Sequence, residues 1–156
     1  MGGNGPREAG VRAFLDSNVF FSGFYSRKGA PGKILEEAAG GSFRVVVSRQ
    51  VLDEVVRTLA EKLPGALPFL NAFLVNIPLE VCTDPGPGEV GAWEKVVGRD
   101  DAPIAAAAHA ADVDLLVSGD RHFLEARSRA AGKGLRITSP AGFLHALAER
   151  SQQERR

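Results

Sequence analysis

Four acidic residues of this chain stand at places where a carboxylate can do chemistry. Asp16 ends the apolar run VRAFL, and Asp120 follows the run LLVSG. Glu54 lies within an amphipathic stretch, and Asp101 precedes the run APIAAAAHAA. Carboxylates gathered in one crevice repel one another unless a cation lies between them. Acid clusters without His or Cys suit Mg²⁺ or Mn²⁺, ions that bind phosphates and activate water.

Each of these acids also has a simpler explanation. Asp16 and Asp120 are turn-forming residues at the ends of apolar runs. Asp101 stands where a helix N-cap is expected, a position at which free amides and the helix dipole favour a carboxylate. Glu54 lies on one flank of an apolar helix face and Asp53 lies on the other. Periodicity therefore leaves open which of these two faces the crevice, and a solvated helix acid is the simpler explanation for both.

The elements that must position these acids follow from apolar runs and turn signals. Strands are expected at 11–15, 43–47, 79–82, 115–118 and 135–138. Helices are expected at 31–39, 49–63, 67–74, 90–98, 102–111 and 123–131 and from Pro140 onward, with a loop at 84–89. Continuous apolar strand runs are typical of a parallel sheet covered on both faces. The predicted fold class is α/β, with helices in layers on both sides of a central parallel sheet of four to five strands.

This fold predicts where the acids meet. In open parallel sheets, ligands bind beyond the carboxyl ends of the strands, where the strand order reverses. If the first and fourth strands are neighbours, Asp16 and Asp120 share one crevice. Asp101 begins the helix that leads into the fourth strand, so it can reach the same edge.

Composition indicates one globular domain without strong bulk charge. The chain has 156 residues, and we expect a single domain at 11–148 between a Gly-rich leader at 1–10 and a polar, frayed tail at 149–156. The 19 Lys and Arg residues balance 19 Asp and Glu residues, so a nucleic-acid contact needs a local patch. Six basic residues lie in segments that flank the expected crevice, although solvated surface is the simpler explanation for each: Arg27, Lys28, Lys33, Arg49, Arg99 and Arg121.

Cys82 and the histidines give weaker signals. A single cysteine excludes an internal disulfide and a cysteine-rich zinc site, and predicts a buried thiol in a reducing compartment. The sequence begins without a secretory pattern and holds no run of about 18 apolar residues, so a cytoplasmic location is expected. His122 is expected in an exposed turn, with substrate contact as the alternative, and His109 and His145 on helix surfaces or in helix packing.

Four segments together resemble the PIN domain family, metal-dependent ribonucleases that include many toxins of bacterial toxin-antitoxin pairs. They are FLDSNVFFSG, LDEVV, RDDAPIAAAAHAADVDLLVSGDRHF and RITSPAGFLHAL. The resemblance covers roughly residues 11–147, and its motifs are short, so their order and spacing carry it. It implies a parallel sheet with adjacent first and fourth strands, a bound Mg²⁺ or Mn²⁺ and an RNA substrate. It also implies a small antitoxin partner and frequently a homodimer.

The resemblance assigns roles to individual residues. Asp16, Glu54, Asp101 and Asp120 match the four metal-binding acids, which decides for Glu54 over Asp53. Asn18 is expected to orient Asp16, and Ser118 is the hydroxyl neighbour of Asp120. The stretch before Asp101 is longer than the family pattern, which leaves Asp100 or Asp84 as alternatives for the third ligand.

Two alternatives to an active nuclease remain. A haloacid-dehalogenase-type phosphatase also begins with an aspartate after the first strand, but it needs an acid where this chain has Asn18. A catalytically idle PIN-like module that binds RNA or a protein is the other alternative. Phe69, Phe73 and Leu74 are expected in the core, with a partner interface as the second interpretation.

Overall fold

The computed structural model describes residues 10–155, so the expected leader lies outside the described residues except for Gly10. The strands are β2 (Arg12–Leu15), β3 (Arg44–Ser48), β4 (Leu79–Cys82), β5 (Leu115–Val117) and β6 (Ile137–Thr138). The helices are α1 (Ser17–Tyr25), α2 (Ala30–Ala39), α3 (Arg49–Lys62), α4 (Leu67–Val75), α5 (Pro87–Val97), α6 (Ala102–Ala110), α7 (Arg121–Glu125), α8 (Arg127–Gly132) and α9 (Pro140–Glu154), with a 3-10 turn, η2, at Pro64–Ala66.

The strands form one parallel sheet in the order β4-β3-β2-β5-β6. Strands β3 and β4 are added on one side of β2, and β5 and β6 are then added on its other side. The strand order therefore reverses between β2 and β5. Phe14 pairs with Leu116 across this junction, and the amide of Asp16 donates to the carbonyl of Val117 at 3.0 Å. The predicted α/β fold and the adjacency of the first and fourth strands are both confirmed.

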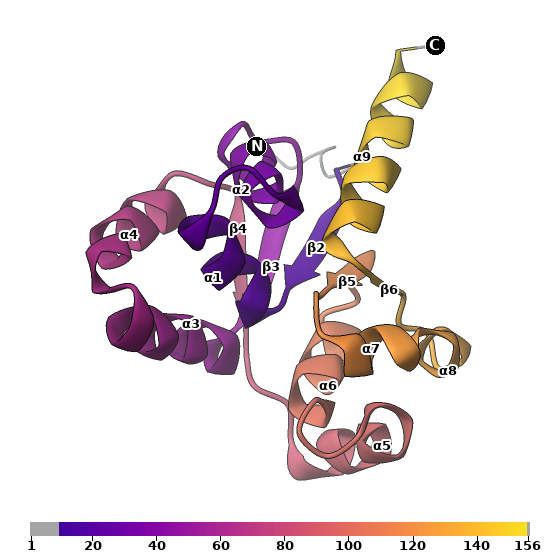
Figure 1. The fold of residues 1–156 in the computed structure, drawn as a ribbon. Coiled ribbons are helices and arrows are strands. Elements are labelled where there is room, and N and C mark those ends of the chain that lie inside the picture. Colours follow the sequence, from indigo (N-terminus) through magenta and orange to yellow (C-terminus); the bar gives the residue numbers. More distant parts are fainter. Residues whose placement is uncertain (1–9, 156) are drawn as a thin grey trace.

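Helices lie on both sides of this sheet, which gives three layers (Figure 1). Helices α1 to α4 form one group and α5 to α8 form the other, with the strands between them. The core strands are buried along nearly their whole length, and Phe14, Val46 and Leu116 are fully buried. Such continuous burial explains why the strands appear in the sequence as unbroken apolar runs.

Serine and proline begin the helices that follow β3 and β6. The hydroxyl of Ser48 accepts a hydrogen bond from the amide of Val51 at 3.2 Å, and that of Ser139 accepts one from Gly142 at 3.0 Å. Both are the capping interactions that their positions predict. Pro140 occupies the first turn of α9, where a proline costs the helix no hydrogen bond.

Two helix predictions were wrong in extent, and one helix was not predicted. Helix α1 begins directly after Asp16, whose carboxylate caps it. Helix α5 begins at Pro87 within the expected loop, because the Glu89 carboxylate accepts from the Gly86 amide at 3.2 Å and closes the first turn. The helix expected at 123–131 is instead two short helices, α7 and α8, which meet at Ala126.

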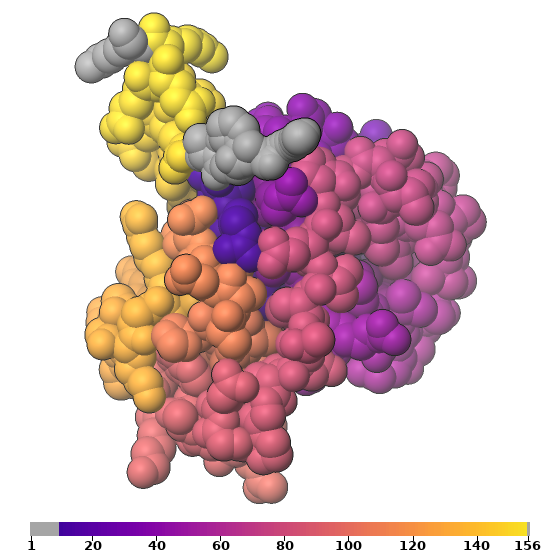
Figure 2. Space-filling view, turned by 180° about the vertical axis from the view of Figure 1, so that it is seen from behind, coloured from indigo at the N-terminus to yellow at the C-terminus, as the bar shows by residue number. Residues whose placement is uncertain are grey.

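The polar end of the chain is helical through Glu154, so the expectation of fraying is wrong for residues 149–154. Spacings of four residues along α9 place His145 near Glu149 and Arg150 near Glu154, with N···O distances of 3.7 and 3.4 Å. Such pairs support an exposed helix. Viewed from behind, the last turns of α9 project beyond the body of the molecule (Figure 2).

The three residues of α4 that were expected in the core differ in their burial. Phe73 packs edge-on against Phe20 and Phe24, with ring centroids 6.5 and 5.8 Å apart, and Leu74 is half-buried. Phe69 is 64% exposed, so the core assignment is wrong for this residue.

The prediction of a buried thiol is also wrong, since Cys82 is half-buried on the edge strand β4. Partial burial nevertheless raises the pKa of this thiol. Among residues 10–155, no helix has the length and apolar character needed to cross a membrane.

Candidate active site

Asp16 occupies the junction between β2 and α1, at the carboxyl edge of the sheet. Its Oδ1 accepts a hydrogen bond from the amide of Ser17 at 2.8 Å, and its Oδ2 accepts one from the hydroxyl of Ser118 at 2.8 Å. The residue is 7% exposed. Burial raises the pKa of the Asp16 carboxyl, the bonds from Ser118 and Ser17 lower it, and the charges of Glu54 and Asp120 raise it further.

Asn18 connects the ends of β2 and β5. Its amide nitrogen donates to Asp16 Oδ2 at 3.1 Å and to Ser118 Oγ at 3.2 Å, while its Oδ1 accepts from the Gly119 amide at 2.9 Å. The Ser118 hydroxyl also accepts from the amide of Asp120 at 3.0 Å. One side chain therefore fixes the orientation of Asp16 and the path of the backbone that leads to Asp120.

Asp101 and Asp120 approach each other from different segments of the chain. Asp120 caps α7, since its Oδ1 accepts a hydrogen bond from the His122 amide at 2.9 Å. Asp101 precedes α6 but, within residues 10–155, its side chain makes no capping hydrogen bond. One ligand atom each from Asp101, Asp120 and His122 lie within 4.8 Å of one another. The simple N-cap explanation is therefore inadequate for Asp101.

The electrostatic surroundings of Asp101 show how closely the acids gather. Its pKa is raised from 3.8 to about 6, first by burial and then by the negative charges of Asp120 and Asp16. His122 lowers this pKa and Asp100 raises it by smaller amounts. Ordinary surface carboxylates do not shift so far, because water screens their neighbours.

Glu54 reaches the same region from α3. It is half-buried and its charge contributes to the raised pKa of Asp16, whereas Asp53 is exposed. The structure thus places Glu54, rather than Asp53, toward the other acids. The Asp84 carboxylate accepts a hydrogen bond from the Gln50 amide at 3.1 Å, in the first turn of α3, and it is not in the group of ligand atoms formed by Asp101, Asp120 and His122. Asp100 is exposed beside Asp101.

A comparison with known protein families decides what this arrangement belongs to. The PIN domain family matches residues 12–122, a range that contains all four acids. This chain is a PIN domain protein. The match gives no support to the haloacid-dehalogenase-type alternative.

Solved structures agree with the PIN domain fold. PAE2754 from Pyrobaculum aerophilum is similar with a TM-score of 0.63 and 18% identity, over 89% of this chain and 96% of that one. VapBC2 from Rickettsia felis, solved with a DNA fragment from the promoter, gives 0.60 and 19% over 83% and 98% of the two chains. VapBC-1 from nontypeable Haemophilus influenzae gives 0.57 and 14% over 84% and 99%. No curated protein matches the chain.

The donor atoms of this PIN domain suit a hard divalent cation. Carboxylate oxygens converge from the ends of β2 and β5 and from the start of α6. The charge of Asp120 raises the pKa of both Asp16 and Asp101, and the charge of Asp16 also raises the pKa of Asp101. Such mutual repulsion is relieved when a cation lies between the groups. The ion pairs of the described residues that involve Lys or Arg, Arg12 with Glu80 and Arg150 with Glu154, lie away from these acids.

The six basic residues expected around the crevice are all exposed: Arg27, Lys28, Lys33, Arg49, Arg99 and Arg121. Arg121 directly follows Asp120 and lines a shallow hollow with Gly119 and Arg127. Arg127 was not among the sequence candidates. His122 was expected in an exposed turn, with substrate contact as the alternative, and its position two residues after Asp120 was the signal that could have identified it as a neighbour of the acids.

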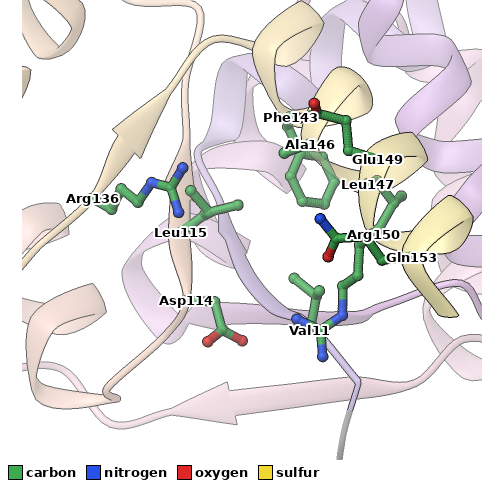
Figure 3. Close-up of a pocket in the computed structure, with 10 residues that line it drawn as sticks. All are labelled: Val11, Asp114, Leu115, Arg136, Phe143, Ala146, Leu147, Glu149, Arg150 and Gln153. Carbon is green, nitrogen blue, oxygen red and sulfur yellow. The ribbon is translucent and has the colours of Figure 1, made fainter.

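A separate cavity lies at the opposite edge of the sheet, between the start of β2 and α9 (Figure 3). It has a volume of about 310 Å³ and is lined by Val11, Asp114, Arg136, Phe143 and Arg150 among others. None of the four acids lines it. This cavity is therefore distinct from the group of acids at the carboxyl edge.

Proposed function

We propose that this PIN domain is a metal-dependent endoribonuclease whose Asp16, Glu54, Asp101 and Asp120 hold Mg²⁺ or Mn²⁺. The observation that carries the proposal is the convergence of carboxylates at the point where the strand order reverses. Asp16 is nearly fully buried, yet neutral donors surround its oxygens, and the charges nearest to it are those of other acids. This arrangement is unfavourable for the folded chain alone and becomes favourable when a cation binds.

The bound cation would polarise the phosphodiester and lower the pKa of the attacking water. The residues of the chain prepare the site for it. Asn18 and Ser118 donate to Oδ2 of Asp16 and hold this carboxylate in one orientation. Asp101, whose pKa is raised to about 6, would be partly protonated in mildly acidic solution and would give up this proton if a cation bound there.

Exposed cations beside the acids are the candidates for binding the substrate backbone. Arg121 and Arg127 line the hollow next to Gly119, one residue from Asp120. Arginine forms paired hydrogen bonds with phosphate oxygens. Arg27, Lys28, Lys33, Arg49 and Arg99 are assigned more weakly to the same role, from their exposure and their segments. RNA as the substrate follows from the family resemblance.

A small antitoxin is the proposed protein partner, and two of the similar structures are VapBC proteins. Its peptide would occlude the crevice. Phe69 on α4 is a large exposed apolar residue and is available for such an interface or for a homodimer. We place this activity in the cytoplasm, where RNA and a reducing environment coincide.

The test is cleavage of a panel of structured and single-stranded RNAs by purified protein with Mg²⁺, with Mn²⁺ and with a chelator. Cleavage that needs added metal and that stops in the chelator supports the proposal. Asp53→Asn is the matched control, because Asp53 neighbours Glu54 but is exposed, and it should cleave like the wild type. RNA binding without cleavage under every metal condition would instead establish the idle module.

A further inference from the structure

His122 stands beside the acids on the first turn of α7. Its amide donates to Asp120 Oδ1 at 2.9 Å, which fixes the backbone, while its ring Nδ1 lies 3.8 Å from the same oxygen. A separation of 3.8 Å is too long for a hydrogen bond. The side chain is 80% exposed, so its contact with Asp120 is a weak ion pair that exists only when the imidazole is protonated.

The other two histidines have different surroundings. His145 on α9 is 77% exposed and lies 3.7 Å from one carboxylate, that of Glu149. His109 packs its ring against Trp93, with centroids 5.3 Å apart. Within residues 10–155, the group of ligand atoms that a metal could share contains His122 together with two carboxylates, Asp101 and Asp120.

The distances allow all three groups to bind one ion. Two atoms that each lie about 2.2 Å from a shared cation are at most about 4.4 Å apart. The three ligand atoms already lie within 4.8 Å of one another, so side-chain adjustments on the order of a few tenths of an ångström bring them into range.

Nitrogen in the donor set changes which ion is preferred. Mg²⁺ binds oxygen ligands and retains water, and it gains little from an imidazole. Ions such as Co²⁺ and Zn²⁺ bind imidazole nitrogen well and bind more tightly overall. A site made of carboxylates alone lacks this source of discrimination.

We propose that His122 supplies a nitrogen ligand to the cation held by Asp101 and Asp120, and that it makes the site prefer first-row transition ions over Mg²⁺. This inference rests on the proposed function and specifies its cofactor. The His122 imidazole, which the family motifs did not assign, thereby becomes part of the metal centre of this chain.

The first test titrates Co²⁺ and Mg²⁺ separately into metal-free protein by calorimetry. His122→Asn should weaken Co²⁺ binding roughly tenfold and change Mg²⁺ binding less than about twofold. His145→Asn is the matched control, since it removes an equally exposed histidine beside a carboxylate, and both affinities should stay at the wild-type values. Equal Co²⁺ affinity in wild type and His122→Asn overturns the inference.

A spectroscopic test reports the bond itself. Pulsed electron paramagnetic resonance of Mn²⁺-loaded protein should show coupling to an imidazole nitrogen in the wild type and in His145→Asn. The coupling should vanish in His122→Asn. Absence of coupling in the wild type, or its persistence in His122→Asn, contradicts a nitrogen ligand at this position.

The same titrations separate this inference from the proposed function. If Asp101→Asn and Asp120→Asn weaken both ions while His122→Asn weakens neither, the metal site stands and the role of His122 is refuted. If neither ion binds to the wild type, the metal-dependent function and the role of His122 are refuted together.

Discussion

Acidic residues have opposite surroundings at the two edges of the sheet. At the amino edge, Asp114 accepts from the amide of Arg12 at 2.8 Å, and Glu80 accepts from the Arg12 guanidinium through both carboxylate oxygens. At the carboxyl edge, Asp16 receives neutral donors and faces Glu54 and Asp120. Acids at the amino edge are paired with Arg12, whereas acids at the carboxyl edge repel one another.

This difference distinguishes acids that stabilise the fold from acids that are available to bind a ligand. A carboxylate that meets a guanidinium stabilises the folded state without further help, although modestly when it is exposed. A buried carboxylate surrounded by like charges lowers stability until a cation binds. The predictions below separate these two classes, beginning with the largest effect.

Asp16→Asn should reduce RNA cleavage by roughly 100-fold or more, because it removes a proposed metal ligand. The same change should leave the melting temperature of the metal-free protein unchanged or higher, because burial and neighbouring charges raise the pKa of this carboxyl. Cleavage assays and thermal unfolding measure the two effects. Retained cleavage by verified Asp16→Asn protein would remove Asp16 from the site.

Glu54→Gln should weaken Mn²⁺ binding by roughly tenfold, whereas Asp53→Asn should leave it unchanged. The two residues are neighbours on α3, but Glu54 is half-buried toward Asp16 and Asp53 is exposed. Calorimetric titration of both variants provides the comparison. Equal loss in the two variants would show a general effect of surface charge.

Asp101 should make the stability of the metal-free protein depend on pH. Its pKa is raised from 3.8 to about 6, so folding favours its protonated form. The resulting contribution to the free energy of unfolding is fully present below pH 3.8 and is lost as the pH rises toward about 6. Urea unfolding across this range should show a flatter pH dependence for Asp101→Asn. Identical pH profiles for the two proteins would contradict the raised pKa.

Arg12→Met should have the smallest effect and should change stability alone. It removes the half-exposed pair with Glu80, which we expect to lower the free energy of unfolding by about 1 kcal/mol or less. Mn²⁺ affinity should stay at the wild-type value, because Arg12 lies at the other edge. Chemical denaturation measures the free energy of unfolding, and calorimetric titration measures the Mn²⁺ affinity. A change in Mn²⁺ affinity would contradict the separation of the two edges.

The parts of the fold that were predictable are those encoded by local pattern. The buried strands appear as continuous apolar runs, and Ser48 and Ser139 mark the helices that they cap. Helix α1 was missed because its sequence SNVFFSGFY mixes helix-disfavouring residues with aromatic residues and shows no clear apolar stripe. Pro87 was assigned to a loop because proline signals a turn and a first helical turn equally well.

The candidate site divides in the same way. Asp16 and Asp120 were predictable because each follows a buried strand, and strand ends share an edge. Periodicity did not distinguish Glu54 from Asp53, because the two lie on opposite flanks of one helix face and packing decides between them. His122 was not recognised as a neighbour of Asp101, because that contact depends on how the start of α6 approaches α7.

Titration of Mn²⁺ into metal-free protein tests the central claim most directly, with Asp16→Asn and Asp120→Asn compared against Asp114→Asn from the amino edge. The account predicts saturable binding that both carboxyl-edge variants weaken by roughly tenfold or more and that Asp114→Asn retains. Binding that is absent, or that all three variants weaken equally, would contradict a metal site at the carboxyl edge.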